Sequence, residues 1–323
     1  KLYLERTRIT ELYIDGKKIG RQESLCTPHI YDLNEYIGTG VHEMTICVSN
    51  VGYKTKGGHL TSPDTQTNWN GITGRIELIG YKNAHAENVM LWCDIHSKTV
   101  RVTANITGGK SGKAVISAES FNSEKSHTPE VQSFEYTDGK LDALYKMGND
   151  CLLWSEHEPN LYKLRIDIDG DVSEHIIGMR EFNTEGGKFT INGEKTFLRG
   201  KHDGMIFPKT AFAPTDLEEW LRVMKISKSY GMNHYRYHTC CPPESAFIAA
   251  DMLGIYMEPQ LPFWGTITEE GEENHNQEEQ DFLVEEGFNM LKLFGNHPSY
   301  CMMSMGNELW GSKKILNDII GGY

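Results

Sequence analysis

The chain has 323 residues, of which 45 are acidic and 32 are basic, and its formal net charge is −13. This length allows roughly two or three domains and a sizeable core. The negative balance argues against a protein that follows nucleic-acid phosphates and against an anionic membrane surface as partner. A neutral or cationic small ligand fits better, and no apolar run approaches the roughly 20 residues of a membrane span.

The cysteines are odd in number, scattered and mostly flanked by apolar residues: Cys26, Cys47, Cys93, Cys151, Cys240, Cys241 and Cys301. This distribution predicts small buried side chains and not a disulfide framework. His234, His238, Cys240 and Cys241 crowd one short segment, and such soft ligands can hold zinc. Their spacing matches no zinc motif, and a strand would send neighbouring side chains to opposite faces, so we expect no metal site.

The first 84 residues have the pattern of short strands and turns. Leu12-Tyr-Ile-Asp-Gly16 predicts a strand that runs into an Asp-Gly turn, and residues 44–48 alternate as a half-buried strand does. Residues 61–80 form a polar loop that leads into another strand. The chain opens within a strand-like run and lacks the shape of a signal peptide there. We therefore expect the start of this domain to be absent from the chain.

Residues 85–179 repeat the pattern with a second set of short strands. Strand-like runs cover 89–94, 100–106, 113–118 and 161–168, and turn signals stand at 108–109, 138–139 and 169–170. Spacings of this kind are typical of a β-sandwich.

After about residue 180, strands alternate with helices. Residues 196–201 are strand-like, and Thr215 with Glu218 has the form of a capping box that opens a helix ending near Gly231. The apolar residues of this helix fall on one face: Leu217, Trp220, Leu221 and Met224.

The alternation then continues toward residue 294. A strand over 232–238, a helix from Pro242 to about Leu253, a strand over 255–260 and a helix over 281–294 follow one another. This succession predicts a parallel β/α sheet, either open or closed into a barrel.

The run from Tyr300 to Met305 predicts a buried strand, because it is short, nearly uncharged and preceded by Asn-His-Pro. Gly306 allows a turn, and Asn307 and Glu308 would then stand at the strand's carboxyl end, where α/β enzymes place their chemistry. The alternative is a core strand followed by an ordinary solvated Glu.

The segment from Asn296-His-Pro-Ser to Gly306-Asn307-Glu308 resembles the acid/base signature of glycoside hydrolase family 2, the family of β-galactosidases, β-glucuronidases and β-mannosidases. Met303 stands where that family usually has Trp. Other stretches agree in order: Tyr13-Ile-Asp-Gly16, Asn68-Trp-Asn-Gly71-Ile-Thr-Gly74, Gly178-Met-Arg-Glu-Phe with Phe189 to Gly200, and Asn233 to His238 followed by Asp251-Met-Leu-Gly254.

The resemblance covers essentially the whole chain and implies a multidomain β plus α/β fold. It implies a jelly-roll sugar-binding-like β-sandwich over 1–84, an immunoglobulin-like β-sandwich over 85–179, and the first half of a (β/α)8 TIM barrel over 180–323. It also implies an exo-acting, retaining β-glycosidase that hydrolyses terminal β-linked sugars. β-Galactosidase is the modal activity, and a non-catalytic carbohydrate-binding scaffold is the alternative.

By this resemblance Glu308 is the general acid/base, and Asn307 hydrogen-bonds the sugar 2-hydroxyl. Arg236 would hold the catalytic carboxylates, unless it forms only a surface salt bridge. The other expected substrate-binding residues, each with a purely structural alternative, are His202, Asp203, His238, Glu258, Trp264 and Trp310. His238 lies two residues after Arg236, where better-known members place their His three residues after.

The family's nucleophilic glutamate lies on a later barrel strand, so we expect it beyond Tyr323 and expect negligible turnover from this chain alone. The expected partner is an oligosaccharide or glycoside, with no cofactor, no nucleic acid and no membrane, and a homo-oligomer is left open. The compartment is not readable from the residues, although the resemblance suggests a periplasmic or secreted protein.

Overall fold

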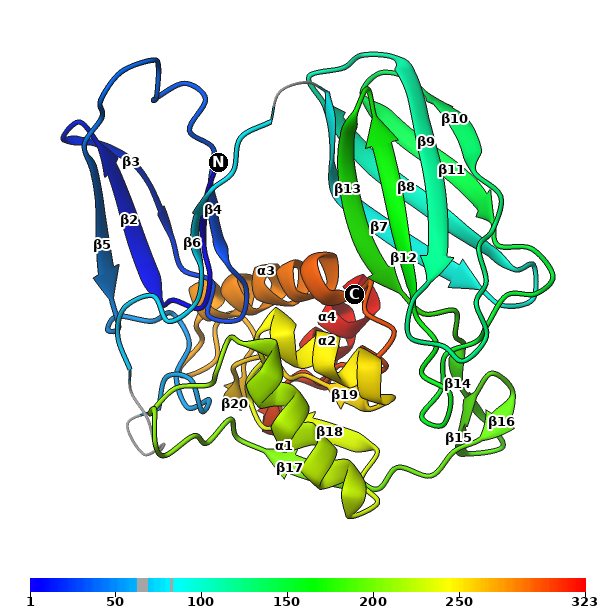
Figure 1. The fold of residues 1–323 in the computed structure, drawn as a ribbon. Coiled ribbons are helices and arrows are strands. Elements are labelled where there is room, and N and C mark those ends of the chain that lie inside the picture. Colours follow the sequence, from blue (N-terminus) through cyan, green and yellow to red (C-terminus); the bar gives the residue numbers. More distant parts are fainter. Residues whose placement is uncertain (63–68, 82–83) are drawn as a thin grey trace.

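The structure is a computed structural model that describes residues 1–62, 69–81 and 84–323. Two groups of antiparallel strands stand apart, and the helices α1 to α4 gather beneath and between them (Figure 1). Asn68 and most of the predicted loop's first half lie outside the described residues. Within the described ranges, no helix combines the length and the apolarity that crossing a membrane requires.

The N-terminal group consists of two antiparallel sheets that bury a common core. One has the order β4-β1-β6 and the other β3-β2-β5. Leu4 and Leu12 are fully buried between them. Asp15 and Gly16 both have positive φ, as a two-residue hairpin turn requires, which confirms the predicted Asp-Gly turn. The strands are β1 (Leu2–Leu4), β2 (Ile9–Ile14), β3 (Lys17–Gln22), β4 (His29–Tyr31), β5 (Met44–Ser49) and β6 (Ile76–Leu78).

The second group also consists of two antiparallel sheets around one core, in the orders β10-β9-β12-β13 and β11-β8-β7. The predicted strands are present, and β10, β11 and β13 are additional. Positive φ at 138–139 and 169–170 confirms the two Asp-Gly turns. The strands are β7 (His85–Asp94), β8 (Thr99–Thr107), β9 (Gly112–Ser120), β10 (Gln132–Tyr136), β11 (Lys140–Lys146), β12 (Tyr162–Ile168) and β13 (Asp171–Ile177).

A small antiparallel sheet leads into a parallel one. The first comprises β14 (Phe182–Glu185), β15 (Lys188–Ile191) and β16 (Glu194–Lys195). The second has the order β17-β18-β19 and comprises β17 (Gly200–Asp203), β18 (His234–Tyr237) and β19 (Tyr256–Glu258). The crossovers carry α1 (Leu217–Ser229) and α2 (Glu244–Leu253). The predicted strand–helix alternation is therefore confirmed for these elements, although the predicted strand over 196–201 is wrong for residues 196–199, because β17 begins at Gly200.

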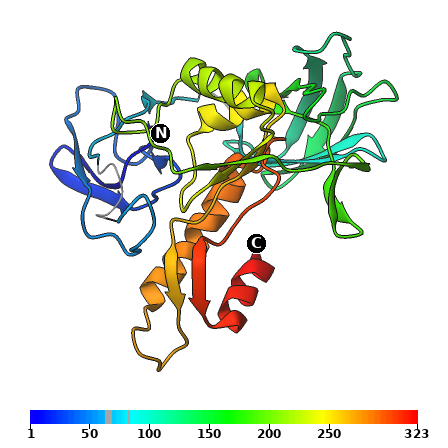
Figure 2. The same ribbon diagram turned by 90° about the horizontal axis from the view of Figure 1, so that it is seen from below.

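The chain continues through β20 (Trp264–Ile267), α3 (Gln277–Phe294), β21 (Asn307–Gly311) and α4 (Lys313–Gly322). β20 pairs with β21 in parallel. Seen from below, β20, β21 and α4 extend away from both antiparallel groups (Figure 2). Trp264 and Trp310, expected just past strand ends, instead lie within β20 and β21.

Helix α1 begins one residue later than the capping box predicted. Asp216 is the N-cap, and its Oδ1 accepts a 2.8 Å hydrogen bond from Glu219 N. Thr215 does not cap the helix, because its hydroxyl bonds instead to Thr73 O at 3.4 Å. The predicted face is confirmed: Trp220 and Met224 are fully buried, and the two leucines pack beside them.

The prediction of a buried strand over 300–305 is wrong in two respects: the segment forms no continuous strand, and most of it is not buried. The segment is extended but makes only isolated parallel bridges, from Met257 to Tyr300 and from Gln260 to Ser304. Pro259 lies between the two bridges and has no N–H to donate, which interrupts the ladder. Residues 301–305 are partly exposed. Asn307 and Glu308 accordingly open β21 and do not end a preceding strand.

Candidate active site

Three polar side chains form a row across one face of the parallel sheet. The register pairs His202 with Arg236, and Arg236 with Glu258. Cα partners in a parallel sheet send their side chains to the same face, so the row runs from β17 through β18 to β19. On the opposite face, Tyr235 and Met257 are fully buried in the core that α1 and α2 share. One face of the sheet is thus structural, and the other presents charged and polar groups.

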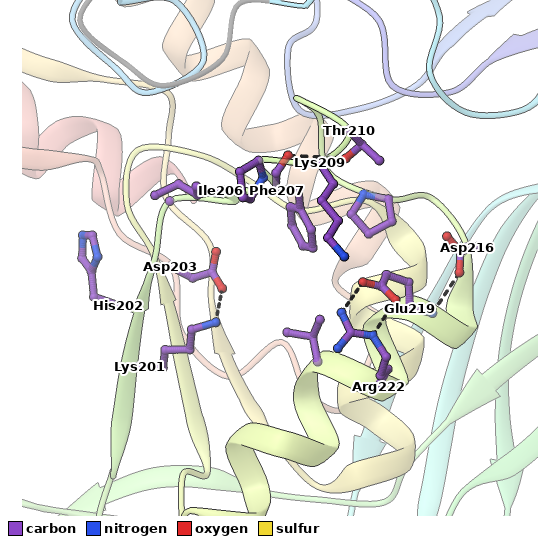
Figure 3. Close-up of a pocket in the computed structure, with 14 residues that line it drawn as sticks. Lys201, His202, Asp203, Ile206, Phe207, Lys209, Thr210, Asp216, Glu219 and Arg222 are labelled. Atoms are coloured by element: carbon purple, nitrogen blue, oxygen red, sulfur yellow. Dashed lines mark hydrogen bonds and ion pairs between the residues drawn. The ribbon is translucent and has the colours of Figure 1, made fainter.

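The alternation also separates His202 from Asp203. Asp203 is on the helix side, where its Oδ2 lies 2.9 Å from Lys201 Nζ and its Oδ1 accepts from Met205 N at 2.6 Å. Figure 3 shows Lys201 and Asp203 joined and His202 pointing away from them. His202 and Asp203 were both expected to bind substrate. The structure instead places them on opposite faces of the sheet.

Arg236 connects this row to the Asn-Glu pair. Its Nη2 donates to Asn307 Oδ1 at 2.9 Å, and its Nε lies 4.0 Å from Glu258 Oε1. Glu258 Oε2 is also 3.2 Å from His234 Nε2. Arg236 is therefore an internal connector and not an isolated surface salt bridge, because it holds an amide and a carboxylate from two other segments.

The residue before the Asn307–Glu308 pair must be glycine, because of its backbone conformation and because Phe263 lies against it. Gly306 has φ +134°, and a Cβ there would lie 2.2 Å from Phe263 O. Asn307 N donates to the same Phe263 O at 3.0 Å. Glu308 itself has φ 45° and an exposed side chain, and its Oε2 accepts a 3.0 Å hydrogen bond from Trp264 Nε1. Gly306 has the positive φ that glycine permits, but the chain forms no turn there and runs directly into β21, so the predicted turn is wrong.

A cluster of imidazoles lies beside Trp264. The ring centroid of His238 is 4.5 Å from that of His59, 4.8 Å from that of His202 and 5.0 Å from that of Trp264. Burial, and then the neighbouring His59, His202 and Arg236, lower the pKa of His238 to about 4. Burial and His202 also lower the pKa of His59. His59 and His238 are therefore favoured as neutral imidazoles, each of which can donate and accept one hydrogen bond.

His59 was missed by the sequence analysis. It lies in the N-terminal group's long loop and reaches the parallel sheet, where its N–H donates to Thr239 Oγ1 at 2.7 Å. The local signal is Gly57-Gly58: a Cβ on Gly57 would lie 2.5 Å from Trp264 O, and one on Gly58 would lie 2.7 Å from Pro262 O. Paired glycines indicate a close approach of backbone, but they do not reveal the approached segment.

Trp310 is placed differently from Trp264. It is 71% exposed in β21 and pairs in register with Thr266. Its indole is thus available to solvent beside Glu308, whereas Trp264 is engaged with the carboxylate.

The histidines and cysteines of 234–241 do not converge. Cys240 and Cys241 are fully buried in the core of the parallel sheet, and burial raises the pKa of the Cys240 thiol. Over the described ranges, no group of three or more His, Cys, Asp or Glu is placed to hold a metal ion.

A cavity of about 910 Å³ lies between β17 and α1, on the helix side of the sheet (Figure 3). Its charged groups are largely paired: Lys201 with Asp203, and Arg222 with Glu219 at 2.5 Å. Of the polar row only His202 lines this cavity, and Arg236, Glu258, Asn307 and Glu308 do not, so we assign the candidate site to the row and the Asn-Glu pair.

The site therefore offers a solvent-facing carboxylate with an indole donor, an amide held by a guanidinium, and imidazoles suited to hydroxyl groups. This set lies on the polar face of a parallel sheet, next to the N-terminal antiparallel group, and its hydrogen-bonding groups suit ligands of the polyhydroxylated class.

Comparisons with known proteins agree with this class. Residues 84–180 match the family model described as glycosyl hydrolases family 2. The chain is 22% identical to a β-galactosidase of Leuconostoc mesenteroides, covering 92% of this chain and 30% of that protein. It is 24% identical to a β-galactosidase of Halalkalibacterium halodurans, covering 95% of this chain and 31% of that protein.

The fold is similar to that of a solved β-glucuronidase of Bacteroides uniformis, with a TM-score of 0.77, 16% identity, and coverage of 99% of this chain and 41% of that one. The family-model match is confined to residues 84–180, whereas the similarity to the two β-galactosidases and to the solved structure extends over nearly the whole chain. The chain spans about a third of the length of these curated relatives.

Proposed function

We propose that the full-length protein is a retaining exo-β-glycosidase, with β-galactosidase as its activity, in which Glu308 is the general acid/base. The observation that carries the proposal is the joint placement of Asn307 and Glu308: Arg236 holds the first and Trp264 holds the second. Asn307 and Glu308 are adjacent in the chain, and each is held by a separate donor. The amide can therefore hydrogen-bond a sugar hydroxyl while the acid protonates the glycosidic oxygen.

In the proposed reaction, Glu308 first gives its proton to the leaving glycosidic oxygen while the bond from that oxygen to the anomeric carbon breaks. A second carboxylate, about 5–5.5 Å away, attacks the anomeric carbon. Glu308 then removes a proton from the water that releases the sugar. The proposal assigns no residue to the nucleophile's role, and Glu258 is a supporting residue because His234 and Arg236 already engage its two oxygens.

Binding of the sugar is proposed for the polar groups around the pair. Asn307 would meet the 2-hydroxyl, and His202 and His238 would meet further hydroxyls, His238 as a neutral imidazole because its pKa is lowered to about 4. Trp310 offers an exposed indole face for a sugar ring. A neutral His238 favours a neutral sugar over a uronide, and the two curated relatives reported above are named β-galactosidases, whereas the solved structural relative is named a β-glucuronidase.

We also propose that the chain comprises two β-sandwich domains followed by the first half of a barrel. Parallel β17, β18 and β19, continued by the bridges at Tyr300 and Ser304, support the first half of a (β/α)8 barrel over 180–323. β17 is an edge strand, which leaves room for a further neighbour. The paired sheets support a jelly-roll sugar-binding-like domain over 1–84 and an immunoglobulin-like domain over 85–179.

The test is hydrolysis of a panel of nitrophenyl β-glycosides by the full-length protein and by its Glu308→Gln variant. We expect the galactoside to be preferred, and we expect Glu308→Gln to lower kcat by about 10²–10⁴-fold on poor leaving groups. Glu158→Gln, at an exposed position of the second antiparallel group, is the matched control. Unchanged hydrolysis by Glu308→Gln would overturn the assignment, and sugar binding without hydrolysis by the wild type would favour a binding scaffold.

The chain of 323 residues is assayed in parallel. We expect negligible turnover from it, and full activity in this form would contradict the proposal that the site draws on further residues.

A further inference from the structure

We infer that Trp264 and His59 are positioning residues for Glu308, so that a loop of the N-terminal antiparallel group orients the carboxylate through the indole of Trp264. This inference rests on the proposed function; it adds His59, which the sequence analysis did not name, and it gives Trp264 a role other than binding the sugar.

The indole of Trp264 contacts the carboxylate directly. Its Nε1 donates to Glu308 Oε2 at 3.0 Å, and the backbones are paired, because Trp264 is the register partner of Asn307 in the β20–β21 ladder. The exposed carboxylate therefore has a fixed donor on one oxygen. Its other oxygen remains available to a substrate.

The other side of the indole is packed against imidazoles. The rings of His238 and Trp264 are 5.0 Å apart at 79°, and those of His59 and Trp264 are 6.5 Å apart at 78°. Both contacts are edge-to-face, and His59 is also 4.5 Å from His238. Edge-to-face packing restricts the rotation of an aromatic ring. The orientation of the Nε1–H bond thus depends on two histidines from separate parts of the chain.

The loop that carries His59 is built into the parallel sheet region. Gly57 bridges Phe263, His59 N donates to Thr239 Oγ1 at 2.7 Å, and Leu60 is buried in the same core as Tyr237. The approach at Gly57 and Gly58 leaves no space for a Cβ against residues 262–264. The loop is therefore fixed against the backbone that presents Trp264.

Two buried arginines secure both sides of this contact. Arg8 Nη1 donates to Leu60 O, next to His59, and Arg6 Nη1 donates to Cys241 O at 2.8 Å, three residues after His238. Both arginines lie in the short segment between β1 and β2 and are at most 5% exposed. One segment of the N-terminal group thus anchors both histidines that contact Trp264.

The consequence for the reaction is specific. A fixed donor on one oxygen of the carboxylate sets the direction in which the remaining oxygen points. Loss of this donor should therefore harm proton delivery to the leaving group more than it harms sugar binding. A merely structural role would lower activity on all substrates alike.

The experiment uses the full-length protein with Trp264→Phe, which keeps a ring but removes the N–H, and with His59→Ala. Aryl β-galactosides of graded leaving-group pKa are compared. We expect each variant to lose about 10-fold in kcat on the poorest leaving group and less than about 2-fold on dinitrophenyl galactoside, which needs no acid assistance. Trp92→Phe, a half-exposed Trp on distant β7, is the matched control.

A double-mutant cycle tests the proposed route. If His59 acts through Trp264, the double variant should lose little more than Trp264→Phe alone. Additive losses, or equal losses on all leaving groups, would overturn the inference. Failure of the proposed function has a different outcome: no hydrolysis by the wild type, or no effect of Glu308→Gln. Circular dichroism and thermal unfolding identify any variant that does not fold, and in that case Trp264→Tyr, which also lacks the indole N–H, replaces it.

Discussion

Asp251 and His297 form a buried pair in which Asp251 Oδ2 lies 2.6 Å from His297 Nδ1. Asp251 Oδ1 accepts a further hydrogen bond from Ser299 N at 3.0 Å. Burial alone lowers the pKa of His297, but the Asp251 carboxylate more than offsets this, and the pKa is raised above its ordinary value. The pair joins helix α2 to the start of the extended segment that leads to Glu308.

The first prediction concerns this pair. Asp251→Asn leaves His297 without its carboxylate in a site from which water is excluded, and removing one partner of a buried ion pair costs about 3–5 kcal/mol. We expect a lower denaturant midpoint for the chain, measured by circular dichroism and by fluorescence of Trp154, whose Nε1 donates to Asp251 O. Asp142→Asn, in an exposed pair with Arg101, should change stability by less than about 0.5 kcal/mol. Equal effects of the two substitutions would contradict the prediction.

The second prediction concerns Arg236. Lysine cannot reproduce the guanidinium's reach to both Asn307 and Glu258, so Arg236→Lys should lower kcat/KM of the full-length protein by about 10–100-fold, the equivalent of one charged hydrogen bond. The measurement is steady-state kinetics on the preferred glycoside. Arg222→Lys, an exposed Arg paired with Glu219 on α1, is the control and should retain activity. Wild-type kinetics for Arg236→Lys would show that the connection to Asn307 is dispensable.

The third prediction distinguishes two effects of a substitution at Gly57: the strain of its positive φ and the loss of its close contact with the backbone of Trp264. Gly57 has φ +89° and lies against Trp264 O, whereas Gly52 has φ +75° with nothing within 4 Å of a built Cβ. Alanine is strained at either position, but only at Gly57 must the loop also move away from Trp264. We expect Gly57→Ala to reproduce the leaving-group dependence of His59→Ala, and Gly52→Ala to keep wild-type kinetics. Similar kinetics in the two glycine variants would exclude a special role for the approach.

The fourth prediction is a pH dependence of stability in the N-terminal sheets. His29 is fully buried, and burial lowers its pKa to about 4, partly opposed by the hydrogen bond of Nε2 to Ser24 O. The neutral ring fits its partners, since Nδ1 lies 2.6 Å from Thr10 Oγ1.

The folded state binds a proton on His29 only near pH 4, whereas the unfolded state binds it near pH 6.5. The free energy of unfolding should therefore fall as the pH drops from about 6.5 to 4. Below pH 4 this group should cause no further loss. The contribution is at most about 3 kcal/mol. Thermal unfolding of wild type and His29→Gln at pH 7.5 and pH 5 measures it, and the variant should lose less stability between the two pH values. His96→Gln, at an exposed His, should behave as wild type. An unchanged pH dependence in His29→Gln would refute the assignment.

Much of the local structure was predictable from the sequence. Asp-Gly pairs specify two-residue turns because both residues adopt positive φ, and the apolar spacing over 217–224 specifies one buried helix face. The order of strands and helices after residue 200 predicts the parallel sheet. Each crossover helix returns the chain to the end of the sheet at which the strands begin, so successive strands run in the same direction. Likewise, Gly306 before Asn307 and Glu308 indicated a backbone that other residues cannot adopt.

Other features were decided only by the tertiary structure. The sequence favoured Thr215 as the helix cap, but Thr73, which lies 142 residues away, accepts its hydroxyl hydrogen bond. The run 300–305 has a strand-like composition, but ladder regularity depends on its neighbour, and that neighbour contains Pro259. His202 and Asp203 are adjacent in sequence but lie on opposite faces once β17 pairs with β18.

His59 shows the limit most plainly. Nothing local to residues 57–60 encodes Trp264, because their contact joins segments 205 residues apart and exists only when the N-terminal sheets pack against the parallel sheet. The sequence by itself determined that an Asn-Glu pair follows a glycine after a strand–helix succession. Only the tertiary structure decided which donors hold that pair, since hydrogen bonds and ring contacts depend on distances that chain order does not specify.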